Sequence, residues 1–207
     1  MNTPKIDTII FDFGGVLIDW NPEEIYLEAF NGDLKKVRWF LSEICPYEWN
    51  DNQDAGYPLA KATQDRIDLY PQYENLIKMY YGQWEKSIIG PITQTVDILN
   101  SIKKSESYQL YGLTNWSAET FPIAKNKYPF LDWFEGIVVS GEEKTRKPFP
   151  LIYQILLNRY KINPDKSVFI DDNIKNIKGA ESAGIPAIHF TNPEKLIDDL
   201  NKMGVYF

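Results

Sequence analysis

The chain has 207 residues, of which 43% are hydrophobic and 25% charged, a composition typical of a soluble globular protein. Its 22 Lys and Arg and 29 Asp and Glu give a formal net charge of −7, so we expect no nucleic-acid partner. Asp7 and Asp12 interrupt the first apolar residues, and no apolar run approaches the roughly 18 residues that span a bilayer, so we expect no membrane partner. The single cysteine, Cys45, excludes an internal disulfide and suits a reducing compartment, and we expect a cytoplasmic protein.

The first predicted element is an apolar stretch at residues 8–11 that runs directly into Asp12, Gly14 and Gly15. Such a stretch closed by glycines predicts a buried parallel strand that ends in a tight turn. Asp12 then lies at the strand's carboxyl end, where its carboxylate could attack an anionic ligand or bind a metal ion, beside backbone amides of the turn. An ordinary Asx turn is the alternative for this aspartate.

Residues 20–90 show helical periodicity only, with a helix start at Asn21 and Pro22. We expect a helical domain over these residues, without a strand, inserted directly after the first strand of a domain formed by residues 1–19 and 91–207. An insertion at that point places the helices above the strand's carboxyl end, as a lid.

From residue 91 onward strands and helices alternate. Strands are expected at 108–113, 136–140, 167–170 and 185–189, and helices near 93–103, 150–160, 174–183 and 193–202. This alternation predicts an α/β fold with a doubly wound, mostly parallel sheet.

Polar residues follow four of the predicted strands: Asp12, the pair Thr114 and Asn115, the loop 140–147, and the pair Asp171 and Asp172. In a parallel sheet these strand ends meet in one crevice. Several carboxylates placed together are costly unless a cation lies among them, and hard oxygen ligands favour Mg²⁺. Lys147, in the loop, is a point charge for a phosphate or for Asp12. Taken singly, Asp171 and Asp172 also fit a helix N-cap, Thr114 and Asn115 fit an ordinary turn, and Lys147 fits an exposed lysine.

In this order and spacing, residues 12–17, Thr114-Asn115, Lys147-Pro148 and residues 169–173 resemble the four motifs of the haloacid dehalogenase-like (HAD) hydrolases. The resemblance extends over essentially the whole chain and implies a Rossmann-like core with a helical cap. It is closest to small cytoplasmic phosphatases, which include glucose-1-phosphate phosphatases and the phosphatase domain of soluble epoxide hydrolase.

The resemblance implies a role for each matching residue. Asp12 matches the nucleophile that forms an aspartyl-phosphate, and Lys147 matches the lysine that neutralises the phosphoryl group. The Mg²⁺ ligands are Asp12, the backbone carbonyl of Gly14 and Asp172, with Asp171 and Asn176 near by. The remaining matches hold phosphoryl oxygens: Thr114, the amide of Asn115, and the turn of Gly14 and Gly15.

One position departs from the family pattern. HAD phosphatases usually carry a second aspartate two residues after the nucleophile as general acid and base, and this chain has Gly14 there. Such a group contributes about 10²–10⁴-fold to the rate. Asp19, Glu48 and Asp51 are candidates to replace it.

The polar and aromatic segment 47–54 of the predicted cap could stack on a sugar through Trp49 and bond its hydroxyls through Asn50. An ordinary helix connection with solvated polar residues is the competing interpretation.

Three functions therefore stay open at this point. The first is a Mg²⁺-dependent phosphatase of a small phosphorylated metabolite, such as a sugar phosphate. The second is a 2-haloacid dehalogenase that uses Asp12 on carbon without a metal, and the third is a catalytically impaired phosphate-binding module. The sequence gives no indication of the oligomeric state.

Overall fold

The computed structural model describes residues 5–207. Its main sheet contains five parallel strands in the order β5-β4-β1-β6-β7. The strands are β1 (Thr8–Phe11), β4 (Gln109–Thr114), β5 (Gly136–Val139), β6 (Ser167–Asp171) and β7 (Ala187–His189). The predicted α/β fold with a parallel sheet is confirmed, and its first strand lies at the centre, between the strands that carry Thr114 and Asp171.

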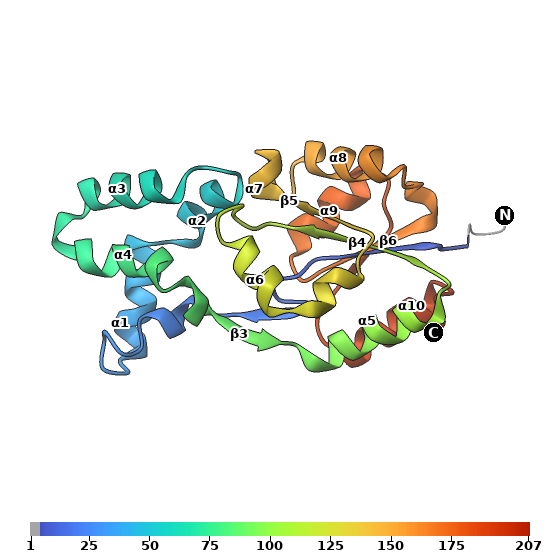
Figure 1. Ribbon diagram of the computed structural model, residues 1–207, viewed down its shortest axis with the longest axis horizontal. Helices are drawn as coiled ribbons and strands as arrows, with labels where there is room; N and C mark the ends of the chain where they lie inside the picture. Colours follow the sequence, from blue (N-terminus) through green and yellow to red (C-terminus); the bar gives the residue numbers. More distant parts are fainter. Residues whose placement is uncertain (1–4) are drawn as a thin grey trace.

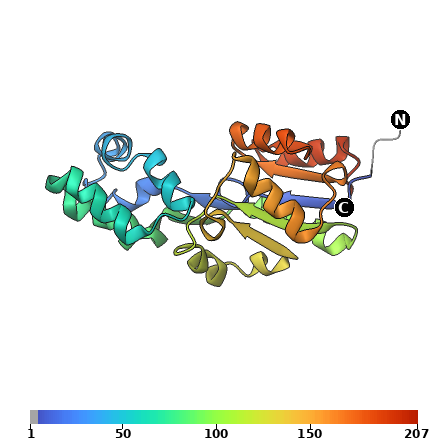
Figure 2. The ribbon, with the colours of Figure 1, turned by 90° about the horizontal axis from the view of Figure 1, so that it is seen from above.

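Helices cover both faces of this sheet (Figures 1 and 2). Side chains of β1 alternate between the two resulting cores: Ile10 packs with α8 (Pro150–Tyr160) and α9 (Ile174–Ser182), whereas Ile9 and Phe11 pack with α5 (Thr93–Ser105) and α10 (Pro193–Lys202). Both faces of β1 are fully buried, which explains its unbroken apolar sequence. The connections also contain α6 (Phe121–Lys127), α7 (Ser140–Glu143) and short 3₁₀ turns at Pro129–Trp133 and Pro164–Lys166.

A helical insert lies beyond one end of the sheet (Figure 1). It contains α1 (Leu34–Trp39), α2 (Tyr47–Asp54), α3 (Leu59–Leu69) and α4 (Glu74–Gly82). Shorter helical turns occur at Pro22–Ile25, Phe40–Ile44, Pro71–Tyr73 and Trp84–Ser87. Buried aromatic residues, among them Tyr26, Phe40, Tyr80 and Trp84, fill its interior. We call this helical insert the cap.

Two short strands join the cap to the sheet domain. β2 (Ile18–Trp20) and β3 (Ile88–Pro91) form a two-stranded antiparallel sheet. The prediction that residues 20–90 contain no strand is therefore wrong at both ends of that range. These strands have three and four residues, too few for a period-2 pattern, and they form because the two chain segments that cross between the domains run side by side.

Within residues 5–207, none of the helices has the length and apolar character needed to cross a membrane.

Candidate active site

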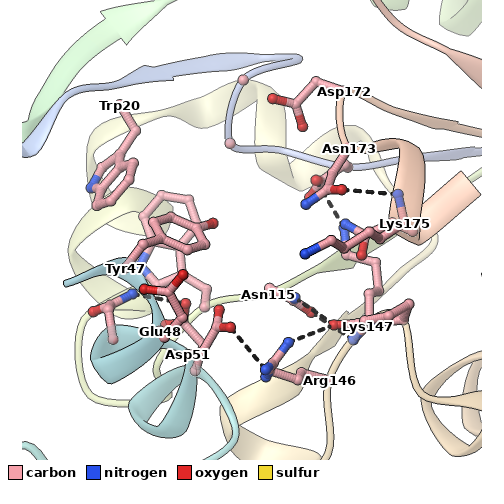
Figure 3. Close-up of a pocket in the computed structure, with 18 of the residues that line it drawn as sticks. Trp20, Tyr47, Glu48, Asp51, Asn115, Arg146, Lys147, Asp172, Asn173 and Lys175 are labelled. Atoms are coloured by element: carbon pink, nitrogen blue, oxygen red, sulfur yellow. Dashed lines mark hydrogen bonds and ion pairs between the residues drawn. The ribbon is translucent and has the colours of Figure 1, made fainter. Parts of the chain in front are cut away.

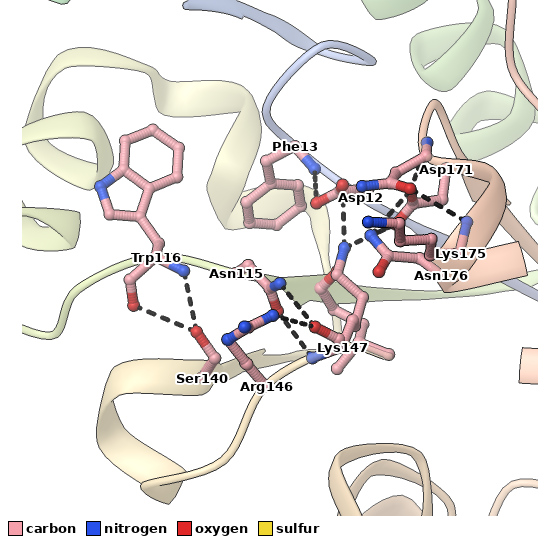
Figure 4. Close-up of polar contacts among 12 residues, drawn as sticks. Asp12, Phe13, Asn115, Trp116, Ser140, Arg146, Lys147, Asp171, Lys175 and Asn176 are labelled. Carbon is pink, nitrogen blue, oxygen red and sulfur yellow. Dashed lines mark hydrogen bonds and ion pairs between the residues drawn. The ribbon is translucent and has the colours of Figure 1, made fainter. Parts of the chain in front are cut away.

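A buried lysine lies between two aspartates at the carboxyl edge of the sheet (Figure 4). Lys147 Nζ is 2.8 Å from Asp12 Oδ2, just beyond β1, and 2.7 Å from Asp171 Oδ2, at the end of β6. The side chains of Lys147 and Asp171 are completely buried, and that of Asp12 is 10% exposed. A buried cluster of this kind is stable only when its charges are paired and its remaining hydrogen-bonding groups are satisfied.

Hydrogen bonds with a backbone carbonyl and with a side-chain amide hold Lys147 in position. Its Nζ also donates to the carbonyl oxygen of Leu113, at 2.9 Å. Asn115 and Lys147 exchange two hydrogen bonds: the lysine amide donates to Asn115 Oδ1 at 2.8 Å, and Asn115 Nδ2 donates to the lysine carbonyl at 3.0 Å. Asn115 thus ties the end of β4 to the loop after β5, which brings Lys147 to the centre of the site.

The two aspartates are also held by hydrogen bonds. Phe13 N donates to Asp12 Oδ1 at 2.7 Å. Asn176 Nδ2 donates to both oxygens of Asp171, at 3.0 and 3.1 Å, and Asn173 N donates to Oδ1 at 2.8 Å. Both Asp171 oxygens are therefore engaged, and this residue positions Lys147 and the start of α9.

Burial and charge act in opposite directions at this site. Burial raises the pKa of Asp12, although Lys147 partly offsets the rise. Burial alone would lower the pKa of Lys147, but Asp12 and Asp171 outweigh it and the net pKa is raised. Lys147 therefore stays positively charged. Burial and then Asp171 raise the pKa of Asp172, which indicates surplus negative charge on this side of the site.

The acidic groups fit a divalent cation. Asp12, Asp171 and Asp172 each offer a carboxylate oxygen, and these atoms lie within 4.8 Å of one another. Asp171 is completely buried and does not line the cavity, so Asp12 and the exposed Asp172, which do, are the carboxylates best placed to bind an ion. Hard oxygen ligands in small number suit Mg²⁺, which keeps part of its water shell.

Gly15 is required for Asp172 to approach the turn after β1. It has φ of +73°, and a Cβ built there would lie 2.3 Å from Asp172 Oδ2. At Gly14, in contrast, a Cβ would meet no atom within 4 Å. The turn therefore needs glycine at residue 15 but has room for a side chain at residue 14.

A cavity of about 600 Å³ opens above the aspartates, between the sheet domain and the cap. Figure 3 shows side chains from both units around it. Aromatic residues form much of its wall: Trp20, Tyr47, Trp84, Trp116 and Phe149. Its charged residues are Asp12, Glu48, Asp51, Asp54, Asp172, Arg146, Lys147 and Lys175.

The structure places the other predicted site residues in different ways. Gly14, Gly15, Asn115 and Asn50 line the cavity with Asp12, Lys147 and Asp172. Thr114 is buried at the end of β4 and is not among the lining residues, and its hydroxyl has no hydrogen-bond partner in residues 5–207. Trp49 packs against Tyr80 and Tyr81 inside the cap and is absent from the cavity wall, so its placement does not support a contact with substrate.

Sequence reasoning missed two contacts between the cap and the sheet domain. Arg146 NH2 pairs with Asp51 Oδ2 at 2.8 Å, with both side chains about four-fifths buried. Ser140 Oγ, which accepts from Trp116 N at 2.9 Å, donates to the backbone carbonyl of Asp54. The one indication of Arg146 in the sequence was its position directly before Lys147. No local pattern indicated its partner Asp51, which lies 95 positions earlier.

The fold and the site together define an α/β protein with an inserted helical cap and a carboxylate–lysine centre at the carboxyl edge of its sheet. Residues 9–190 match the family model described as haloacid dehalogenase-like hydrolase. The chain belongs to this family, and the resemblance inferred from the four motifs is confirmed.

Named relatives extend this result. The chain is 24% identical over 187 residues to the sesquiterpene phosphatase astK of Aspergillus oryzae, covering 88% of this chain and 89% of the relative. It is 21% identical over 187 residues to a phosphorylated carbohydrates phosphatase of Thermotoga maritima, covering 89% and 84%. The fold resembles the crystal structure of a HAD family enzyme of Bacteroides thetaiotaomicron in complex with magnesium and inorganic phosphate, with a TM-score of 0.67, 24% identity and coverage of 90% and 94%.

The turn after β1 yields a first prediction. Gly15→Ala forces a Cβ into the Asp172 carboxylate and a left-handed backbone onto alanine, which alone costs about 1–2 kcal/mol. We expect urea denaturation to show a loss in unfolding free energy of at least that size, whereas Gly14→Ala, which meets no neighbour, changes it by less than about 0.5 kcal/mol. Equal losses in the two variants would contradict this account of the turn.

The buried lysine yields a second prediction. Lys147→Met leaves Asp12 and Asp171 buried without their cation, and removing one partner of a buried ion pair costs about 3–5 kcal/mol. Urea unfolding at neutral pH, without added metal, measures the loss. The matched control is Lys175→Met, which removes an exposed lysine of the same cavity and should change stability by about 0.5 kcal/mol or less. Similar losses in both variants would show that the buried triad of Lys147, Asp12 and Asp171 does not stabilise the fold.

Proposed function

We propose that this protein is a Mg²⁺-dependent phosphatase that hydrolyses a small phosphorylated metabolite through an aspartyl-phosphate on Asp12. The observation that carries the proposal is the placement of Lys147 between Asp12 and Asp171, with Asp172 beside them. A nucleophilic carboxylate, a fixed cation and a set of metal ligands are the parts that phosphoryl transfer needs, because positioning and charge stabilisation provide most of its catalysis.

The relatives support the same chemistry. The two named above are called phosphatases, and the similar fold from Bacteroides thetaiotaomicron was solved with magnesium and inorganic phosphate. The names differ in leaving group, a terpenoid in one and a carbohydrate in the other. They therefore support a phosphomonoester substrate without choosing its organic part.

In the proposed first step, Asp12 attacks the phosphorus atom. Its Oδ1 accepts from Phe13 N and its Oδ2 contacts Lys147, so the carboxylate is already oriented before substrate binds. Lys147 keeps part of the negative charge on Asp12 despite burial and faces the place where the phosphoryl oxygens would lie. Bound between Asp12, the Gly14 carbonyl and Asp172, Mg²⁺ would neutralise charge that develops on the phosphoryl group.

Asn115 and Thr114 complete this proposal. The side chain of Asn115 is engaged with Lys147, which leaves its backbone amide to hold a phosphoryl oxygen. The hydroxyl of Thr114, buried at the end of β4 and without a hydrogen-bond partner in residues 5–207, is a spare donor. In the second step, water attacks the phosphorus atom of the aspartyl-phosphate and frees Asp12.

The cavity favours an uncharged leaving group. With every group ionised, its five carboxylates exceed its three cations by two charges, and one divalent ion restores balance. A second phosphate or carboxylate on the substrate would find only Lys175 among these cations, because Arg146 and Lys147 are already paired with carboxylates. The aromatic wall provides flat surfaces for stacking, and Glu48 and Asp51 offer acceptors, so we propose a sugar as the organic part.

Activity tests this function directly. We expect the wild-type protein to release phosphate from sugar phosphates and p-nitrophenyl phosphate with Mg²⁺, to lose that activity in EDTA, and to recover it when Mg²⁺ is restored. Asp12→Asn should lower turnover by at least about 10⁴-fold, as loss of a catalytic nucleophile does. A covalent phosphoprotein that hydroxylamine cleaves should form in the wild type alone.

Two outcomes would replace the proposal. Release of halide from 2-haloacids in EDTA, without phosphatase activity, would favour a dehalogenase. Phosphate binding without turnover of any phosphomonoester would favour the phosphate-binding module.

A further inference from the structure

The floor of the cavity is formed by the turn after β1 and the aspartates next to it. At residue 14 of this turn, where HAD phosphatases usually carry an aspartate, this chain has no side chain that could donate a proton. Gly14 carries no side chain, and the space that its Cβ would occupy has no neighbour within 4 Å. A leaving oxygen with high proton affinity needs a proton as its bond to phosphorus breaks. That proton must therefore come from elsewhere in the cavity.

Four of the five carboxyl groups that line the cavity are unsuited to this task. Asp12 is the proposed nucleophile and Asp172 a proposed metal ligand. Asp51 is paired at 2.8 Å with Arg146, which opposes the rise that burial causes in its pKa. Glu48 is exposed to solvent, and Asp19, a candidate from the sequence, is exposed on β2 and is absent from the cavity wall.

The fifth carboxyl group belongs to Asp54, at the end of α2. Its side chain lines the cavity and yet the residue is only 6% exposed. Asn50 Nδ2 donates to its Oδ2 at 2.9 Å, and Tyr81 OH donates to Asn50 Oδ1 at 2.9 Å. No salt bridge reaches Asp54 from any residue in 5–207. It is thus a carboxyl group fixed by hydrogen bonds, without an ion pair in the described chain, that the cap brings to the cavity.

Asp54 is tied to the sheet domain through its own backbone. Ser140 Oγ, at the start of α7, donates to its carbonyl oxygen. This contact keeps the end of α2 against the loops that follow β4 and β5, where Asn115 and Lys147 lie. Tyr47 lines the same cavity, and burial, followed by the charges of Asp54, Asp51, Asp12 and Asp172, raises the pKa of its hydroxyl.

We propose that Asp54 is the general acid and base of this enzyme, in place of the aspartate missing at residue 14. The inference rests on the proposed phosphatase function. As Asp12 forms its bond to phosphorus, the bond to the leaving oxygen breaks and Asp54 passes its proton to that oxygen. Water then attacks the aspartyl-phosphate, its proton goes to the Asp54 carboxylate, and the bond between phosphorus and Asp12 breaks. Both residues return to their starting state.

The surroundings of Asp54 suit a group that both gives and takes a proton. Burial and then Asp51 raise the pKa of Asp54 to about 7, against Arg146, the Ser117 amide and Lys147. The other ionisable groups that sense its charge are hydroxyls of the cap: Tyr47, Tyr80 and Tyr81. An acid of this strength is protonated below pH 7, so we expect acid catalysis to decline as the pH rises above it.

The test compares leaving groups. Phenyl phosphate releases a weakly acidic phenol that needs a proton, whereas p-nitrophenyl phosphate releases a stable anion. We expect Asp54→Asn to lower kcat/KM for phenyl phosphate by about 10²–10⁴-fold and for p-nitrophenyl phosphate by less than about tenfold. The wild-type decline in phenyl phosphate turnover above pH 7 should be absent from the variant.

A second variant restores the proton donor at the floor. Because the space at Gly14 is open, Gly14→Asp in the Asp54→Asn background should raise phenyl phosphate turnover at least about tenfold, toward the contribution of a general acid. Asp51→Asn is the matched cap control, and it should change the ratio of the two kcat/KM values far less than Asp54→Asn does. Circular dichroism and urea unfolding verify that each variant is folded.

The outcomes separate the two proposals. Equal losses on both substrates in Asp54→Asn, with no gain from Gly14→Asp, would show a structural role and overturn this inference while leaving the phosphatase intact. A shift of the substrate ratio in Asp51→Asn instead would assign the proton to that residue. A wild-type protein without turnover of either ester would overturn the proposed function itself.

Discussion

The pairing of one buried lysine with two buried aspartates is the interaction on which the site depends. Lys147 lies 2.8 Å from Asp12 and 2.7 Å from Asp171, in surroundings from which water is almost completely excluded. Three charges in such a place destabilise a fold unless each has its partner and its hydrogen bonds. The sheet supplies them by placing β1 between β4 and β6. The Leu113 carbonyl then accepts from the ammonium group, Asn115 bonds the backbone of Lys147, and Asn176, on α9, donates to Asp171.

Most of the fold could be predicted from the sequence, because strands buried on both faces leave continuous apolar runs and helices leave a 3.6-residue period. Residues 8–11 and 167–170 are of the first kind, and the structure places both runs at the centre of the sheet. β2 and β3 have too few residues for either pattern. They exist because the two crossings between sheet and cap lie side by side, a fact of tertiary structure that no local window contains.

The difference between local sequence patterns and contacts that arise only in the tertiary structure also explains which site residues the sequence indicated. Asp12, Asn115, Lys147 and Asp172 follow predicted strands, so topology alone gathers them. The contacts of Asp51 with Arg146 and of Asp54 with Ser140 join the cap to the sheet domain, and they depend on how the cap rests on the sheet. Trp49 and Asn50 are neighbours on α2 that local sequence does not distinguish: Trp49 packs in the aromatic interior of the cap, whereas Asn50 lines the cavity.

The proposed catalytic groups are divided between the sheet domain and the cap, and this division has a chemical consequence. Every residue that we assign to charge stabilisation lies in the sheet domain, whose buried triad cannot move without breaking several hydrogen bonds. The proposed proton donor lies on the cap, which the Asp51–Arg146 pair and the hydrogen bond from Ser140 hold against the sheet domain. Proton transfer would then require the cap to rest on the sheet domain, whereas attack by Asp12 would not. Substrates with acidic leaving groups should therefore tolerate an open cap, and only weakly acidic leaving groups should require it to close.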